Sequence, residues 1–151
     1  MNIEKKLESM GITIPPMSPP VAAFVPVRQM GNALYVSGQL PAKDGKMVYT
    51  GKVGTERSVE DGQEAAKLCS INALSALKAY LGDLDKIKNI IKLLIFVNSA
   101  DGFTQQPAVG NGASQFFVDV FGEAGQHARS AIGVNELPFD VTVEIELIVE
   151  I

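Results

Sequence analysis

Apolar residues recur at helical spacing in the middle of the chain, between residues 58 and 81. Ser58 and Asp61 form a capping-box-like start for this helix, and Gly82 directly after Leu81 is a suitable residue to end it. The apolar stripe uses small side chains together with Leu77 and Tyr80. This pattern predicts a helix that packs closely on a sheet.

A second helical stripe begins at Pro107, a residue favoured in the first turn of a helix, and ends at Gly122. The tripeptide Gly110-Asn111-Gly112 lies in its first turns. Each glycine there costs the helix about 1 kcal/mol relative to alanine. We therefore expect another part of the chain to pack very closely against these glycines.

Other runs follow the two-residue period of a strand. From Val141 to Ile151, apolar residues alternate with Thr142, Glu144, Glu146 and Glu150, and Ile148 is the exception. The almost continuously apolar run 90–97 predicts a central strand that is buried on both faces. Further strands are predicted in residues 21–30, 33–37 and 129–134, with a brief pairing in 47–50.

These elements follow one another as β-β-(β)-α-β-α-β-β, an order that predicts an α+β two-layer sandwich with a mixed sheet and two main helices on one face. Residues 2–10 have the spacing of a short amphipathic helix, and prolines then keep the chain extended as far as Pro20. We expect residues 1–151 to form a single domain, in which residues 1–20 are a helix and a proline-rich lead-in.

The composition mainly excludes classes of function. A net charge of -4 argues against binding to nucleic acid or to an anionic membrane surface. The single cysteine cannot form an internal disulfide, and no apolar segment is long enough for a signal peptide or a membrane span. We expect a cytoplasmic protein.

Few residues could carry chemistry. One histidine and one cysteine make no metal site, and no phosphate-binding loop is present, so neither a metal nor a cofactor is expected. Cys69 lies within a helical stripe and is interpreted as a core residue. Arg129 could bind a carboxylate and Glu144 could move a proton. On the residues alone, however, a structural salt bridge for Arg129, a solvated sheet face for Glu144 and a loop position for His127 are the favoured interpretations.

Three segments change that balance: GNALYVSGQLP at 31–41, NGASQFFVDVFG at 111–122 and HARSAIGVNELPFDVTVEIELI at 127–148. Their sequences and spacing resemble the RidA family, also called YjgF/YER057c/UK114 and labelled endoribonuclease L-PSP-like. The arginine, the Leu-Pro turn and the acidic strand are the most specific features. The longer loops and the HARSA segment resemble a divergent branch of that family.

The resemblance implies a chorismate mutase-like fold and a homotrimer with ligand clefts between subunits. It also implies hydrolysis of reactive enamines and imines to 2-oxo acids and ammonia without a cofactor. Arg129 matches the arginine that holds the substrate carboxylate, and Glu144 matches the glutamate that positions water. The substrate-binding positions implied by the resemblance are Phe24, Ser37, Gly38, Gly110, Asn111 and Ala131.

Two of these positions depart from RidA itself. Phe24 replaces a tyrosine beside the substrate, and Ala131 replaces a cysteine in the pocket wall. The resemblance therefore supports an imine and enamine deaminase. The departure at Phe24 favours an alternative, a non-catalytic trimer that binds a small carboxylate metabolite. An endoribonuclease is disfavoured by the acidic chain and the missing second histidine.

Overall fold

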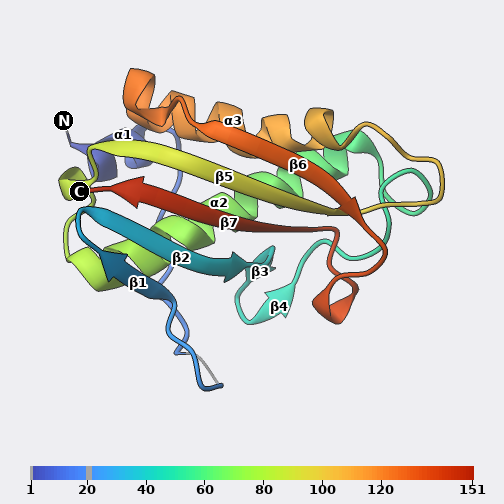
Figure 1. Ribbon diagram of the computed structural model, residues 1–151, viewed down its shortest axis with the longest axis horizontal. Helices are drawn as coiled ribbons and strands as arrows, with labels where there is room; N and C mark the ends of the chain where they lie inside the picture. Colours follow the sequence, from blue (N-terminus) through green and yellow to red (C-terminus); the bar gives the residue numbers. More distant parts are fainter. Residues whose placement is uncertain (1, 20–21) are drawn as a thin grey trace.

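The computed structural model describes residues 2–19 and 22–151, which form a five-stranded sheet with helices on one side (Figure 1). The strand order is β1-β2-β7-β5-β6. The strands of this sheet are β1 (Val27–Met30), β2 (Ala33–Gln39), β5 (Asn89–Asn98), β6 (Ala128–Val134) and β7 (Val143–Glu150). A separate small hairpin pairs β3 (Ala42–Lys43) with β4 (Lys46–Met47).

The sheet is mixed, as predicted. β1, β2, β7 and β5 pair antiparallel along the sheet, whereas the edge strand β6 runs parallel to β5. Helix α3 (Gln106–Phe121) and the short turn Gly122–Gly125 provide the crossover between the two parallel strands. A bulge interrupts the pairing of β2 with β7 between Val36 and Gln39. The bulge contains Ser37 and Gly38, two of the predicted substrate-binding residues.

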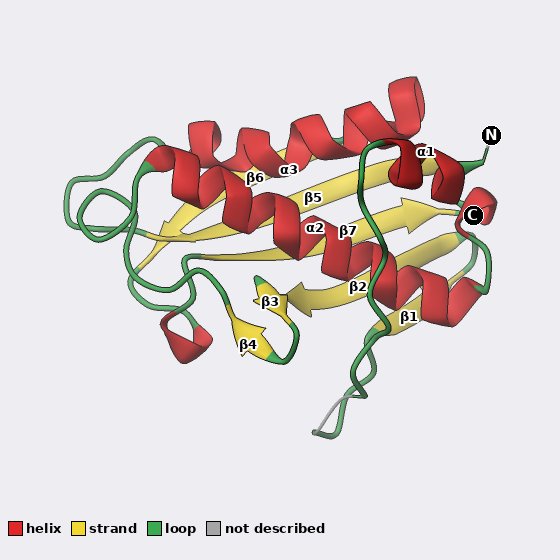
Figure 2. Ribbon diagram, turned by 180° about the vertical axis from the view of Figure 1, so that it is seen from behind, coloured by secondary structure: helices red, strands yellow, loops and turns green. Residues whose placement is uncertain are grey.

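Three helices lie on the same face of the sheet: α1 (Ile3–Ser9), α2 (Val59–Leu81) and α3 (Figure 2). Helix α2 packs on β2 and β7, and α3 packs on β5 and β6. The predicted ends of α2 are confirmed, because Ser58 and Asp61 form a capping box and Gly82 adopts a left-handed C-cap. The resulting two-layer α+β architecture agrees with the prediction.

Of the two glycines predicted to allow close packing, Gly112 lies where α2 and α3 cross, whereas Gly110 faces Ile95 of β5. A Cβ on Gly112 would overlap the backbone of Gln63 in α2, and a Cβ on Gly62 would lie 2.9 Å from Cγ1 of Val109. The hydrophobic core fills the space between these helices and the sheet. The two helices can therefore approach only because both lack side chains at the crossing.

The prediction that residues 90–97 are buried on both faces was wrong. In β5, Ile90, Leu93, Ile95 and Val97 are buried beneath the helices, but the alternating positions are only partly covered and Ile91 is 43% exposed. The reason is that helices cover only one face of the sheet in this chain. The other face of the sheet, which we call the open face, carries the remaining side chains of β5.

Three further predictions need correction. The first strand is limited to Val27–Met30 rather than 21–30, and Pro20 and Val21 lie outside the described residues. The brief pairing expected at 47–50 is confirmed only at its two ends, because Met47 pairs with Ala42 and Thr50 forms an isolated bridge with Val141. Thr142, expected on the polar face, is fully buried against the segment 49–51, where its hydroxyl donates to the carbonyl of Gly51 and its backbone N–H to that of Tyr49.

Tyr80, expected in the apolar stripe of α2, is 48% exposed and donates its hydroxyl to Gln29. In the part of the chain that is described, no helix has the length and apolar character needed to cross a membrane.

Candidate functional site: two half-sites on opposite faces of the sheet

Arg129 of β6 lies beneath the first turns of α3. Its register partner in β5 is the buried Leu93, so its side chain points to the helix-covered face of the sheet. We call the surrounding group the arginine half-site; it consists of Gly110, Asn111, Ser114, His127, Arg129 and Ala131.

Two side chains of α3 hold the guanidinium. Nη1 of Arg129 donates to Oδ1 of Asn111 at 2.9 Å and to Oγ of Ser114 at 3.1 Å. Among residues 2–19 and 22–151, no carboxylate lies within ion-pair distance of Arg129. A structural salt bridge therefore does not explain this arginine, and Nη2 and Nε are free to bind a ligand carboxylate.

Gly110 and Ala131 give the guanidinium its space. A Cβ on Gly110 would lie 2.7 Å from Cδ1 of Ile95 and 3.3 Å from Nη1 of Arg129. Ala131 is two residues after Arg129 and faces the same side of β6, at 3.5 Å from that hypothetical Cβ. Larger side chains at these positions would push the arginine away from Asn111 and Ser114.

Glu144 of β7 lies on the open face, opposite Phe96 of β5. It lines a hollow of about 490 Å³ that the strands β2 and β7 share with the segment before β1. The residues lining this hollow, which we call the glutamate half-site, are Phe24, Arg28, Tyr35, Val36, Ser37, Gly38, Glu144 and Glu146.

The bulge in β2 shapes this half-site. The side chain of Glu144 lies against Gly38, where a Cβ would overlap its carboxyl group. Ser37 donates its hydroxyl to the carbonyl of Val25 at 2.7 Å, and its backbone N–H donates to Pro26. Ser37 thus fixes the segment that carries Phe24, a residue that is 56% exposed at the hollow.

Burial raises the pKa of Glu144, and the neighbouring carboxylate of Glu146 raises it further. Both effects disfavour the ionised carboxylate, so the group titrates closer to neutrality than a free glutamate. A carboxyl group of this kind accepts and returns a proton more readily near neutral pH. Glu144 is half-buried and therefore does not belong to a merely solvated sheet face.

The sheet separates the two half-sites within one chain. Arg129 and Ala131 share the helix-covered face with Leu93 and Ile95, whereas Glu144 and Glu146 share the open face with Phe96 and Leu94. Of the predicted site residues, the structure thus brings together Gly110, Asn111, Arg129 and Ala131 as one group, and Phe24, Ser37, Gly38 and Glu144 as another. It does not bring the two groups together.

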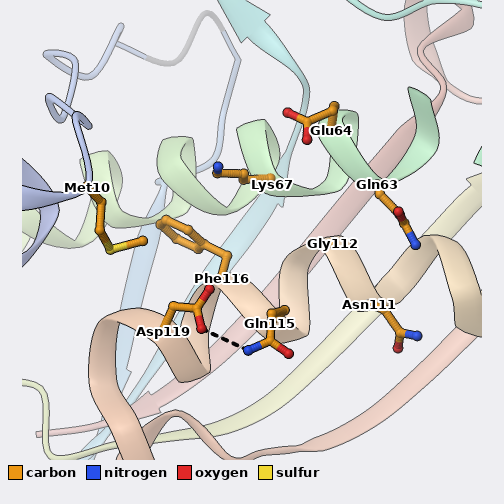
Figure 3. Close-up of a pocket in the computed structure, with 9 residues that line it drawn as sticks. All are labelled: Met10, Gln63, Glu64, Lys67, Asn111, Gly112, Gln115, Phe116 and Asp119. Atoms are coloured by element: carbon orange, nitrogen blue, oxygen red, sulfur yellow. Dashed lines mark hydrogen bonds between the residues drawn. The ribbon is translucent and has the colours of Figure 1, made fainter. Parts of the chain in front are cut away.

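A second hollow, of about 360 Å³, lies between α2 and α3 (Figure 3). Glu64, Lys67 and Asp119 contribute charges at its rim, and Gln115 donates to Asp119 at 2.8 Å. Neither Arg129 nor Glu144 lines it. It meets the arginine half-site only at Asn111 and shares no residue with the glutamate half-site.

The sequence did not identify four residues of the half-sites: Ser114, Arg28, Tyr35 and Glu146. Ser114 lies one helical turn after Asn111, a spacing that places both residues on the same side of α3 and could have indicated Ser114 as a site residue.

Cys69 is fully buried, and burial raises its pKa well above the usual value, in agreement with the predicted core position. In residues 2–19 and 22–151, no three His, Cys, Asp or Glu side chains form a group that could hold a metal ion.

Comparison with known proteins agrees with this fold. A family model described as "YjgF/chorismate mutase-like, putative endoribonuclease" matches residues 4–151. The chain is 43% identical to Protein TCP17 of Trypanosoma cruzi, over 99% of this chain and 94% of that protein. It is 31% identical to a 2-iminobutanoate/2-iminopropanoate deaminase of Dermatophagoides farinae, over 90% of this chain and 92% of the relative.

Among solved structures, the protein Atu1372 from Agrobacterium tumefaciens, of unknown function, superimposes with a TM-score of 0.93 at 49% identity. That match covers 99% of this chain and 92% of the other.

Proposed function

The chain belongs to the YjgF/chorismate mutase-like family, and on this basis we propose that it is a deaminase of small imines and enamines that carry a carboxylate. One relative bears the name of such a deaminase, which supports the proposal. The products would be a 2-oxo acid and ammonia. The single cysteine suits a reducing compartment, so we place the enzyme in the cytoplasm.

The observation that carries this proposal is the unpaired guanidinium of Arg129. Asn111 and Ser114 occupy Nη1, while Nη2 and Nε have no carboxylate partner among the described residues. A half-buried arginine held in one orientation with an open edge suits a planar carboxylate. This edge supports the proposed substrate class, since imines of 2-oxo acids carry the carboxylate next to the C=N carbon.

Glu144 supplies the proton transfer. It takes a proton from a water molecule as the oxygen of that water bonds to the C=N carbon, and it then protonates the nitrogen. Glu144 then takes the hydroxyl proton of this adduct and delivers it to the nitrogen, so that the C–N bond breaks and the products are a 2-oxo acid and ammonia. An enamine first takes a proton at carbon to become the imine. The raised pKa of Glu144 suits both the acceptance and the return of the proton.

A complete site then requires two copies of the chain, with the arginine half-site of one against the glutamate half-site of another. The open face supports this assembly, because Tyr35 and Ile132 expose 42% and 44% of their surfaces there. Apolar side chains on an uncovered sheet favour a partner surface. We propose a homotrimer, in which each interface would hold one cleft.

Mixing two inactive variants tests the assembled site. Arg129→Ala and Glu144→Gln chains, carrying different tags and expressed together, are expected to recover about a quarter of wild-type ammonia release. This fraction follows from random pairing, because each cleft draws one half-site from each of two copies. The separately expressed variants are the controls. A mixture as inactive as its components would contradict a site shared between copies, and wild-type protein that releases no ammonia would contradict the deaminase.

A non-catalytic carboxylate-binding protein is the second candidate, and the observation that favours it is Phe24. This side chain borders the hollow without a hydroxyl group that could bind a substrate. The expected result would be thermal stabilisation of the protein by a 2-oxo acid without turnover of the corresponding imine. Stabilisation together with turnover would exclude this candidate.

A further inference from the structure

A chain of hydrogen bonds continues behind Arg129, and the proposed reaction does not use it. Oγ of Ser114, which accepts from Nη1 of Arg129 at 3.1 Å, lies 2.9 Å from Nε2 of His127. The other ring nitrogen of His127, Nδ1, lies 2.7 Å from the carbonyl oxygen of Gly125. Four residues thus link a backbone carbonyl to the guanidinium.

The direction of each bond follows from the carbonyl of Gly125. A carbonyl oxygen only accepts, so Nδ1 of His127 donates to it and a neutral ring leaves Nε2 as an acceptor. Ser114 then donates its proton to Nε2 and uses its oxygen lone pairs to accept from Arg129. Burial and the charge of Arg129 lower the pKa of His127 and outweigh the hydrogen bond to Gly125, which raises it, so the neutral ring is favoured.

The far end of the chain is fixed by packing. Gly125 is buried in the turn after α3, and a Cβ there would overlap the backbone of Phe117. The carbonyl of Gly125 is therefore held against the helix. At the near end, the hydrogen bonds to Asn111 and Ser114 use both N–H groups of Nη1, so the plane of the guanidinium is defined.

We propose that His127 is a positioning residue for Arg129: through Ser114 it fixes the guanidinium so that Nη2 and Nε face the ligand carboxylate. The inference rests on the proposed function only in that Arg129 binds a carboxylate. Loss of the ring nitrogens leaves the hydroxyl proton of Ser114 without its acceptor, so the hydroxyl can rotate and no longer holds Nη1 in one orientation. The freed guanidinium then loses entropy when a carboxylate binds, and affinity falls.

His127 also has a packing role that must be separated from this one. Its ring meets that of Phe117 edge-on, with centroids 6.1 Å apart. His127→Phe keeps a ring against Phe117 and removes both nitrogens, and Ser114→Ala removes the middle of the chain. Ser9→Ala, an exposed serine of α1 that donates to Lys6, is the matched control.

Calorimetric titration with 2-oxobutanoate at pH 7.5 tests the proposal. Each of His127→Phe and Ser114→Ala is expected to weaken the Kd about tenfold, the scale of one hydrogen bond. The double variant is expected to be no weaker than either single variant, because both act through the same bond. Ser9→Ala retains wild-type affinity. Additive losses in the double variant, or unchanged affinity in Ser114→Ala, would overturn the role of His127.

A second measurement needs no ligand. Rotation about the Cζ–Nη1 bond of Arg129, followed by NMR of ¹⁵N-labelled protein, is expected to be slow in the wild type and faster in both variants. Wild-type protein that does not bind 2-oxobutanoate would defeat the proposed function. The rotation rates would still decide the inference, since equal rates in all proteins would show that His127 does not fix the guanidinium.

Discussion

In the arginine half-site, the polar groups around the guanidinium bind one another within a single chain, from the carbonyl of Gly125 to Nη1 of Arg129. In the glutamate half-site, the carboxyl group of Glu144 has no hydrogen-bond partner among residues 2–19 and 22–151, and it borders a hollow. The arginine half-site holds its charged group in one orientation before a ligand binds. In the glutamate half-site, the proposed proton-transfer group is free to change its orientation when a ligand binds. In the proposed function, the group that binds the carboxylate and the group that transfers the proton therefore lie on different faces of the sheet.

The strongest test of this division removes the proton-transfer group. Glu144→Gln keeps the size of the side chain but cannot accept a proton, so kcat is expected to fall by about 10²–10⁴-fold. The Kd for 2-oxobutanoate is expected to change little. Steady-state kinetics with calorimetry would measure both, and the exposed Glu8→Gln is a control. A loss of affinity that matches the loss of kcat would break the division.

The complementary change removes the fixed charge. Arg129→Ala is expected to weaken 2-oxobutanoate binding about 100-fold, because two charge-assisted hydrogen bonds are lost. Arg129→Lys keeps the charge without the fork and is expected to lie between the alanine variant and the wild type. Calorimetry gives the three affinities. Equal affinity of the lysine variant and the wild type would show that only charge matters.

Gly38 tests whether the bulge places Glu144. Gly38→Ala puts a Cβ where the carboxyl group of Glu144 lies, so kcat is expected to fall about tenfold by displacement of that group. The melting temperature should remain close to wild type, since the end of a side chain can move aside. Gly112→Ala is the contrast, because its Cβ meets backbone in α2 and the melting temperature should fall. Wild-type kcat in Gly38→Ala would contradict this placement.

The smallest expected effect concerns pH. The carboxylate of Glu146 helps to raise the pKa of Glu144, so Glu146→Gln is expected to lower it. The proposed mechanism needs Glu144 ionised, and kcat/KM is therefore expected to rise with pH through this pKa. In the variant, the rise should begin at a lower pH than in the wild type. An unchanged pH profile would indicate that Glu146 does not act on the catalytic carboxylate.

The main elements of the fold could be predicted from the sequence because their signals are local. The capping box at Ser58, the proline at 107 and the alternation after Val141 each depend on near neighbours in the chain. The burial of residues 90–97 could not be predicted in the same way. An apolar strand has the same pattern whether its second face is covered by its own chain or left open.

The candidate site shows the same limit. The family resemblance indicated Arg129 and Glu144 by number, but which face each occupies depends on strand register. The role proposed for His127 also depends on three-dimensional contacts, because its partner Ser114 lies thirteen residues away in the preceding helix. A lone histidine in a loop gives no sequence signal for such a contact.

The sheet that separates Arg129 from Glu144 has a consequence for how the activity would depend on protein concentration. A newly made chain that meets no other copy would hold an intact fold and two incomplete sites. Specific activity would then obey mass action, falling on dilution below the dissociation constant of the assembly and returning on concentration. The proposed reaction would therefore proceed only when the concentration of the protein is high enough for the copies to assemble.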